Sequence, residues 1–312
     1  MQDTQAVLTT TLCSVAQNPL AQVGVGRQRT SASLPHFHQV ELIDKMNALW
    51  LPLFVSIVSG LYTSLWGAFK DSPYEGFKPK TFPRSIYFHV ILFFALYFLP
   101  PFYSVFRTLS LFQLFFVVMG LERFLAELYK GFLRTEDQDK YFVPSRITFL
   151  GVYVDNDWVR RGAGLLLVTG VFAVLLIQIP IVRSMTFLLV AYGSGLIVSL
   201  GGAYKDAPFE GFKWLKFQRS AGVVSLASPL FYFANDSTYP IALGFLIYMN
   251  GGLERFIVEY YKTYIQRNMS GKFRPDLERI QTYINAREIF HYAAWVIIVS
   301  LAILYAYEIN LL

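Results

Sequence analysis

The sequence has little charge, a single cysteine and few histidines. Of its 312 residues only 15% are charged, whereas 54% are hydrophobic and the mean hydropathy is +0.42. A soluble domain of this length would carry about a quarter charged residues. The lone Cys13 excludes an intramolecular disulfide, and four scattered histidines argue against a metal site built from Cys and His. The sequence contains no P-loop, dinucleotide fingerprint, HExxH or G-x-S-x-G motif, and nothing in it suggests nucleic-acid binding.

Long apolar runs dominate the chain. Many of them reach about 20 residues, which is enough to cross a bilayer. We therefore expect an all-α polytopic membrane protein with eight transmembrane helices. The expected ranges are 44–67, 86–103, 105–133, 158–179, 182–204, 221–235, 239–267 and 287–309. Pro100-Pro101, Pro180 and Pro240 fall at short connections, where proline can end or start a helix.

Two sequence segments occur twice. Residues 59–85 read SGLYTSLWGAFKDSPYEGFKPKTFPRS and return without a gap at 194–220 as SGLIVSLGGAYKDAPFEGFKWLKFQRS. Each copy is followed by a shorter echo, GLERFLAELYK at 120–130 and GLERFIVEYYK at 252–262, which we call the GLERF segments. We expect a tandem 4+4 repeat, in which helices one to four match helices five to eight. Because four is an even number, both halves would share one orientation about a pseudo-twofold axis along the membrane normal.

The repeat divides the chain into three expected regions. They are a polar N-terminal tail at 1–42, a first four-helix membrane repeat at 43–180 and a second at 181–312. The tail is rich in Thr, Ser, Gln and Ala and holds Arg27 and Arg29, a composition loosely typical of an organelle transit peptide. We favour the alternative of a bacterial tail that is disordered or lies on the surface.

The basic residues predict the orientation. Both KD-P-EGFK loops and both segments that follow GLERF fall on one face, which collects most of the Lys and Arg residues. The positive-inside rule directs this face to the cytoplasm, or to the matrix or stroma of an organelle. The expected location is thus a bacterial plasma membrane or an organelle inner membrane.

The KD-P-EGFK loops hold charged side chains beside aromatic ones. The charged positions that the two loops share are Lys70, Asp71, Glu75 and Lys78 in the first, and Lys205, Asp206, Glu210 and Lys213 in the second. Proline and glycine in each loop predict a sharp turn rather than a helix, at the level of the lipid headgroups. In one interpretation the lysines bind a phosphate, while Asp71 with Glu75, and Asp206 with Glu210, hold a divalent cation such as Mg²⁺ that bridges to it. In the other, which is the commoner case, the charges pair locally and fix the turn.

The GLERF segments place an arginine near the cytoplasmic end of a long helix, and in the first copy the preceding residues, Leu109 to Met119, hold no charge. Arginine inside a membrane helix requires a partner or an aqueous cavity. On a helix Arg123 shares a face with Glu127, and Arg255 with Glu259, so each pair can form at i, i+4. The functional interpretation is an arginine that binds a phosphate or carboxylate. The structural interpretation, which we rate nearly even with it, is an ion pair that snorkels to the surface.

A glutamate and a glycine accompany the arginine in each GLERF segment. The acids Glu122 and Glu254 point about 100° away from the arginines and are expected to meet a different helix. Gly120 and Gly252 lie on the arginine face, where a glycine lets another backbone or a lipid approach closely.

The pattern G-L-E-R-F-[LI]-[AV]-E-[LY]-Y-K resembles the last-helix signature of prolipoprotein diacylglyceryl transferases. In that family the arginine is implicated in binding the phosphatidylglycerol substrate, which the resemblance carries over to Arg123 and Arg255, with Glu127 and Glu259 beside them. The loop arginine and the His-Gly-Gly element of that family are absent from this chain. The resemblance therefore supports a phospholipid-facing site more than it supports the transferase reaction.

A second similarity is to membrane prenyltransferases, whose two aspartate-rich motifs bind magnesium diphosphate. The spacing of Asp71 with Glu75 and of Asp206 with Glu210 matches those motifs. The flanking proline and glycine, however, predict a turn here, whereas the family's motifs lie on helices.

Three functions are therefore open. The first is a protein that binds lipid phosphate headgroups, or a lipid-modifying transferase, with a site at Arg123, Arg255, Lys70, Lys205, Glu127 and Glu259. The second is a non-catalytic accessory or structural subunit of a larger membrane complex, with other membrane subunits as partners. The third, a transporter, is less favoured because the charges cluster at one interface rather than at mid-membrane.

Overall fold

The computed structural model describes residues 34–135, 146–149, 152–182, 184–234, 240–267 and 285–311. The chain divides into two compact units, Met1–Lys45 and Met46–Leu312. Only the start of the first helix is described in the first unit. Everything below concerns the second unit, which contains both copies of the sequence repeat.

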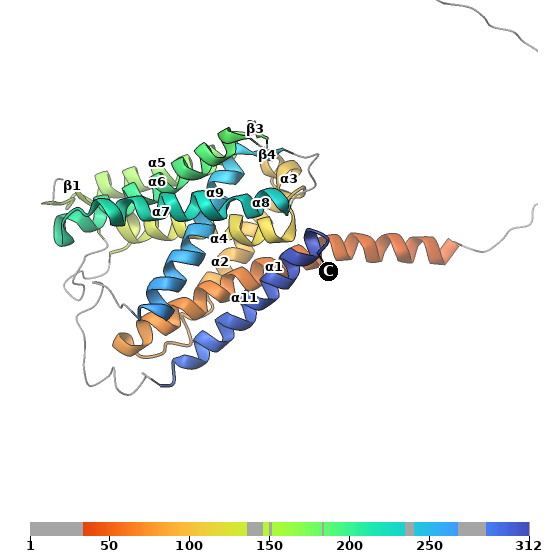
Figure 1. Cartoon of the computed structure of the whole chain (residues 1–312), viewed down its shortest axis with the longest axis horizontal. Helices are drawn as coiled ribbons and strands as arrows, with labels where there is room; N and C mark the ends of the chain where they lie inside the picture. Colours follow the sequence, from red (N-terminus) through yellow and green to blue (C-terminus); the bar gives the residue numbers. More distant parts are fainter. Residues whose placement is uncertain are drawn as a thin grey trace, which may run out of the picture. The chain divides into compact units, whose positions relative to one another are not determined.

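The described chain is almost entirely helical (Figure 1), which confirms the expected all-α class. Its main helices are α1 (Leu34–Glu75), α2 (Arg84–Phe98), α3 (Pro100–Phe106), α4 (Leu111–Leu128), α5 (Asp157–Leu175), α6 (Met185–Glu210), α7 (Trp214–Ala227), α8 (Pro229–Phe233), α9 (Leu243–Glu254) and α11 (Glu288–Glu308). Short π-helical turns extend two of them, η1 (Tyr129–Leu133) after α4, and η2 (Arg255–Glu259) with η3 (Tyr261–Ile265) after α9. Two small antiparallel strand pairs complete the list, β1 (Thr148–Phe149) with β2 (Val152–Tyr153), and β3 (Pro180–Ile181) with β4 (Ile241–Ala242).

Proline breaks two helices that the sequence suggested would be continuous. The helix expected at 86–103 ends at Phe98, and α3 continues at an angle of 97° to α2. The helix expected at 221–235 instead consists of α7, which begins at Trp214, and α8. In both cases proline occupies the first helical position after the break, where its missing N–H costs nothing.

The turn expected at the KD-P-E residues is wrong. Helix α1 continues through Pro73 to Glu75, and α6 continues through Pro208 to Glu210. A proline in the last turn of a helix removes only a single bond, so it does not stop the helix before its end. The stop comes at Gly76 and Gly211, whose φ angles of 72° and 76° are positive and favour glycine.

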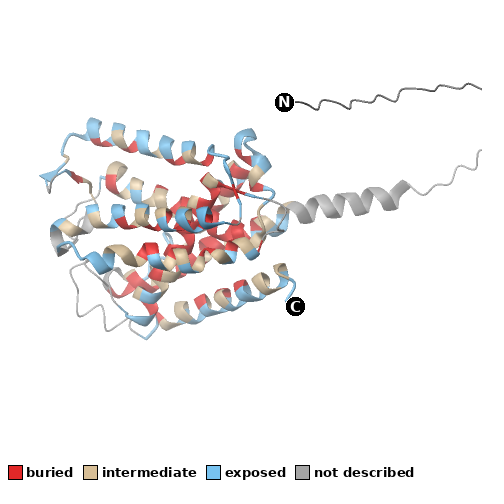
Figure 2. Cartoon of the chain, turned by 45° about the horizontal axis from the view of Figure 1, so that its top comes forward, coloured by how far each residue is buried: buried red, intermediate tan, exposed pale blue. Residues whose placement is uncertain are grey.

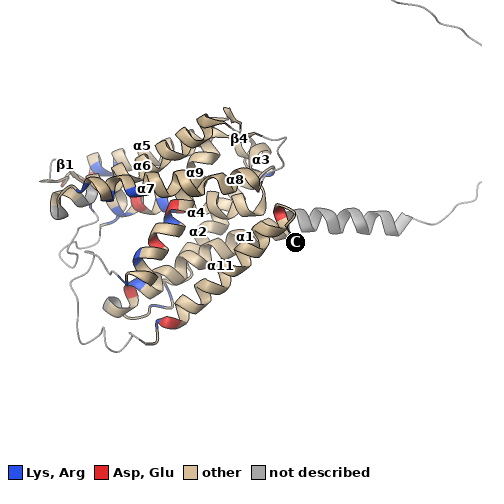
Figure 3. Cartoon of the chain, in the orientation of Figure 1, with Lys and Arg blue, Asp and Glu red and all other residues tan. Residues whose placement is uncertain are grey.

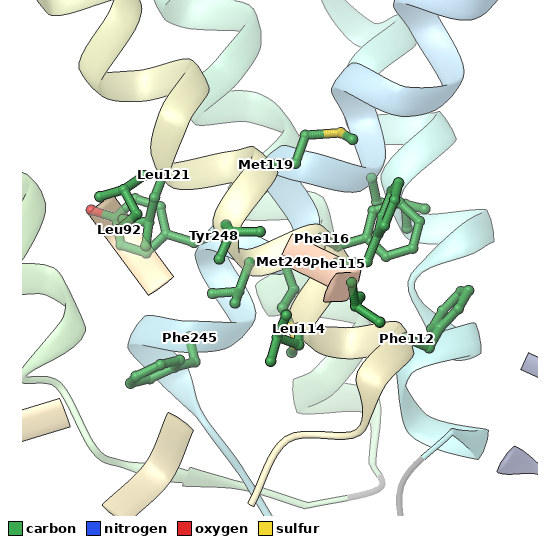
Figure 4. Packing of buried hydrophobic residues seen from close by; sticks show 14 of the residues in the cluster. Leu92, Phe112, Leu114, Phe115, Phe116, Met119, Leu121, Phe245, Tyr248 and Met249 are labelled. Atoms are coloured by element: carbon green, nitrogen blue, oxygen red, sulfur yellow. The ribbon is translucent and has the colours of Figure 1, made fainter. Parts of the chain in front are cut away.

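Helices α4 and α9 cross at the centre of the unit and form its most extensive helix contact. Glycine makes the crossing close: a Cβ on Gly120 would overlap the carbonyl oxygen of Tyr248, and one on Gly252 would overlap that of Phe116. The prediction that these glycines allow close approach is confirmed, and the approaching group is a backbone. Aromatic and aliphatic side chains of both helices, such as Phe116 and Met249, pack around the crossing (Figure 4). Figure 2 shows that the buried residues concentrate in these central helices.

Backbone N–H groups at the N-termini of α4 and α9 donate hydrogen bonds to residues from distant parts of the chain. A carboxylate oxygen of Glu308, at the end of α11, accepts a hydrogen bond of 2.7 Å from the backbone N–H of Leu111 in α4. The backbone N–H of Leu243 in α9 donates to the carbonyl of Ile179, just after α5, at 2.9 Å. Each helix thus finds a partner for one of its orphan N–H groups.

Aromatic contacts join α1 to the end of the chain. The ring of Tyr62 stacks on Phe256, and Phe69 packs against Tyr264 and His291. Helix α1 therefore packs on η2, η3 and α11, which come from the second copy of the repeat. The two copies are not separate bodies but interlock within one compact unit.

Four described helical segments are long and apolar enough to cross a membrane: Leu49–Pro73, Asp157–Leu175, Met185–Tyr204 and Glu288–Glu308. A fifth crossing results if α2 and α3 form one bent span. In the last three of the four, only 17–28% of the apolar window is buried, so most of its residues face outward, as expected in lipid. Eight crossings remain a prediction. Lys and Arg gather toward one end of the helices, near the ends of α1 and α9 and the start of α7 (Figure 3).

Candidate anion-binding site

The arginines of the two GLERF segments form reciprocal ion pairs across the helix crossing. Arg123 of α4 pairs with Glu254 of α9, and Arg255 pairs with Glu122 of α4. The prediction that Glu122 and Glu254 meet a different helix is confirmed, and that helix is the one carrying the other GLERF segment. Neither arginine takes the expected i, i+4 partner as its nearest acid.

Serines at equivalent repeat positions support both glutamates. Ser85 donates a hydrogen bond of 3.3 Å to Glu122, and Ser220 donates one of 2.6 Å to Glu254. Three of the four paired side chains are at most 10% exposed, whereas Arg123 is 20% exposed. A buried carboxylate requires such a pairing, because leaving it unpaired would cost several kcal/mol. Arg123 can therefore neutralise Glu254 and still face a neighbouring space.

That space is a pocket of about 90 Å³ between α6, α7 and the GLERF helices. This is several times the roughly 10–15 Å³ that one water needs. The charged residues that line it are Arg123, Lys213, Lys216, Arg219, Lys262 and Glu254. Among the described lining residues five cations thus surround a single acid, and that acid already pairs with Arg123. Such a balance favours an anion.

Local sequence places the cations. Gly211 ends α6 and reverses the chain, so α6 and α7 run side by side (Figure 1). Lys216, Arg219 and Ser220 lie at i, i+3 and i+4 on α7, which is one face of a helix. That face is turned to the pocket, because all three residues line it.

Two residues that line the pocket each hold a buried polar atom without a hydrogen-bond partner in the described part of the chain. The buried Nε of Arg219 and the buried hydroxyl of Ser199 have no hydrogen-bond partner among the described residues. Buried polar groups in proteins are almost always paired with protein, water or a bound molecule. Arg219 and Ser199 are therefore candidates for contact with a ligand in the pocket that they line.

The predicted lipid-binding residues fall in different places. Arg123 lines the pocket, whereas Arg255 and Lys70 lie on the indole ring of Trp66, at 5.4 Å and 4.7 Å from its centroid. Glu127 pairs with Lys130 at 3.0 Å, and Glu259 pairs with Lys262 at 3.5 Å. The side chain of Lys205 lies outside the described residues.

The predicted metal ligands are only partly described. Asp71 is half-buried in the last turns of α1, whereas the side chains of Glu75, Asp206 and Glu210 lie outside the described residues. No group of three or more His, Cys, Asp or Glu side chains suited to a metal occurs in the part of the chain that the structure describes.

The sequence prediction did not single out Lys213, Lys216, Arg219 and Lys262 as site residues. All four were recognised as members of the basic face, Lys213 also as part of a KD-P-EGFK loop and Lys262 as part of a GLERF segment. Two of the four, Lys216 and Arg219, lie on α7, four residues and one residue before Ser220. This spacing was the available signal in the sequence. Comparison with protein-family models, with curated proteins and with solved structures finds no match to this chain.

Proposed function

We propose that this protein is an integral membrane protein whose pocket binds the phosphate group of an anionic phospholipid. The observation that carries the proposal is the wall of five cations around one already paired glutamate. Arginine suits phosphate because its planar guanidinium donates two parallel hydrogen bonds. The Nε of Arg219 has no hydrogen-bond partner among the described residues, so it is a candidate donor for the phosphate.

The pocket lies on the basic side of the membrane in this proposal. Its walls include the start of α7, where Lys and Arg gather (Figure 3). The positive-inside rule directs that end to the cytoplasm, matrix or stroma, where anionic lipid headgroups are available. The ion pair of Glu122 with Arg255 is the counterpart of the pair of Glu254 with Arg123 in the sequence repeat. This match supports the further proposal of a duplicated four-helix unit with eight crossings.

Native mass spectrometry of the mildly solubilised protein tests the binding. We expect the wild-type chain to retain an anionic phospholipid such as phosphatidylglycerol. Arg219→Gln should weaken that binding about tenfold or more, because a hydrogen bond to a charged group contributes roughly 1.5–3 kcal/mol. Arg84→Gln is the matched control, since Arg84 occupies the equivalent repeat position and is not among the residues that line the pocket. Equal lipid binding by both variants would contradict the proposal.

A parallel titration with inorganic phosphate distinguishes two ligands that carry the same group, a phospholipid and free phosphate. If inorganic phosphate at millimolar concentration displaces the lipid from the pocket that Arg219 lines, free phosphate is the ligand. If only the lipid binds, its acyl chains contribute by contact with the apolar outer face of α6, where Ile197 and Leu200 are exposed.

A structural subunit of a larger membrane complex is the second candidate function. The pair Arg255–Glu122 favours it, because the two charges are buried, neutralise each other and join two helices beside Trp66. The same mass spectra decide between the candidates. Partner subunits that remain bound while no lipid is retained would support the structural function instead.

A further inference from the structure

The residues that line the pocket differ in how far they are buried. Ser199, Ser220 and Glu254 are buried and form its inner wall. Phe212 and Lys213 line the same pocket but are exposed, so they stand at its opening. The inner wall is thus polar, whereas the opening combines an aromatic ring with a cation.

Three aromatic side chains, Phe212, Trp214 and Phe217, pack together at this opening, and we call them the aromatic rim. The centroid of the Phe217 ring lies 5.6 Å from that of Phe212 and 5.8 Å from that of Trp214, on which it stacks. Phe212 and Phe217 both line the pocket. Within the described part of the chain, none of the three rings contacts an aromatic ring outside the rim. An exposed apolar patch that adjoins a polar pocket is typical of a binding surface.

The position of the rim along the chain indicates its level in the proposed membrane arrangement. The apolar segment of α6 runs from Met185 to Tyr204, and the helix continues to Glu210 before Gly211 reverses the chain. The rim follows directly, at the start of α7. Tryptophan is enriched at the level where acyl chains meet lipid headgroups, because its ring is apolar and its N–H is polar.

A phospholipid has two parts that match the pocket and its rim. The phosphate matches the guanidinium groups of Arg123 and Arg219, which line the pocket. The acyl chains begin a few bonds away from the phosphate and match the apolar rings of the rim. Free phosphate and soluble phosphate esters have no apolar part that could cover these rings.

We infer that the aromatic rim selects the ligand by binding the upper acyl chains of a bilayer phospholipid, which therefore enters the pocket from the membrane interface rather than from water. This inference rests on the proposed phosphate binding. It adds the class of ligand, an acylated lipid, and the specificity-determining residues Phe212, Trp214 and Phe217.

Two ligands with the same headgroup test the inference: phosphatidylglycerol and glycerophosphoglycerol, its deacylated form. Each is titrated against the full-length protein in a neutral detergent by isothermal titration calorimetry. The wild type should bind the lipid at least about tenfold more tightly, since burying an apolar side chain of this size contributes at least that factor. Equal affinity for the two ligands would overturn the inference but leave the proposed phosphate binding intact. A wild type that binds neither ligand would contradict the proposed function itself.

Substitutions in the rim identify the residues that make the difference. Trp214→Ala and Phe212→Ala should each weaken phosphatidylglycerol binding about tenfold and leave glycerophosphoglycerol binding unchanged. Trp158→Ala is the matched control, because Trp158 is 88% exposed at the start of α5 and is not among the residues that line the pocket. The control should bind the lipid as the wild type does.

Two results with these variants would overturn the inference. One is lipid binding at wild-type strength by both rim variants. The other is an equal loss in Trp158→Ala, because exposed aromatic rings would then act only as general anchors at the membrane interface. The comparison of the two ligands on the wild type needs no variant, so it decides even where a variant fails to fold.

Discussion

At the scale of residues, the buried charges at the crossing of α4 and α9 pair with each other. Glu122 and Arg255 are 7% and 10% exposed, and Ser85 adds a hydrogen bond to the carboxylate. Replacing such a buried pair by apolar groups can be neutral, but removing one partner strands the other charge. The pair therefore fixes how the two helices meet more than it adds net stability.

Glu122→Ala should lower the free energy of unfolding by about 3–5 kcal/mol, because Arg255 loses its buried partner. Chemical denaturation in detergent measures the change. The control is Glu127→Ala, which removes an ion pair with Lys130 in which Glu127 is 44% exposed, and which should cost about 1 kcal/mol or less. Similar losses in the two variants would show that the crossing pair is not buried in the folded protein.

The sequence predicted the direction in which Glu122 points but not the residue with which it pairs. The angular offset of Glu122 from Arg123 indicates that the glutamate meets another helix, and the structure confirms it. Which helix it meets depends on tertiary packing, so an i, i+4 partner was the only one that local spacing could suggest. The expected transferase reaction and the lipid contact of Arg255 remain predictions.

At the scale of elements, the crossing of α4 and α9 depends on backbone contact. Both glycines of the crossing face a carbonyl oxygen of the opposite helix, which cannot rotate away as a side chain would. The sequence repeat makes this feature visible, because Gly120 and Gly252 precede the same four residues. Sequence could not reveal the length of α1 and α6, since the prolines that suggested a turn lie within the last helical turn.

Gly120→Ala should destabilise the protein by about 1–3 kcal/mol, because the added methyl group forces the two backbones apart. Gly162→Ala is the control. A Cβ on Gly162 in α5 meets nothing within 4 Å, so alanine there should be neutral or slightly stabilising through its higher helix propensity. Unfolding of both variants in the same detergent provides the comparison. Equal stability would mean that α4 and α9 do not touch at this glycine.

At the scale of the whole molecule, the two copies of the repeat form one interlocked unit. Helix α1 of the first copy packs on η2, η3 and α11 of the second, and Glu308 at the end of α11 caps α4. The sequence predicted the helical class and most helix positions because apolar runs and their punctuation are local signals. The interlocking and the pocket arise from contacts between residues far apart in the chain, which local patterns do not encode.

The central claim is that one phosphate group occupies the pocket over Arg123. A crystal structure grown from a lipid mesophase doped with phosphatidylglycerol tests it most directly. The account predicts phosphate density within hydrogen-bond distance of Arg123 and Arg219. A pocket that holds only water, in a crystal where phospholipid is resolved elsewhere on the protein, would contradict the account.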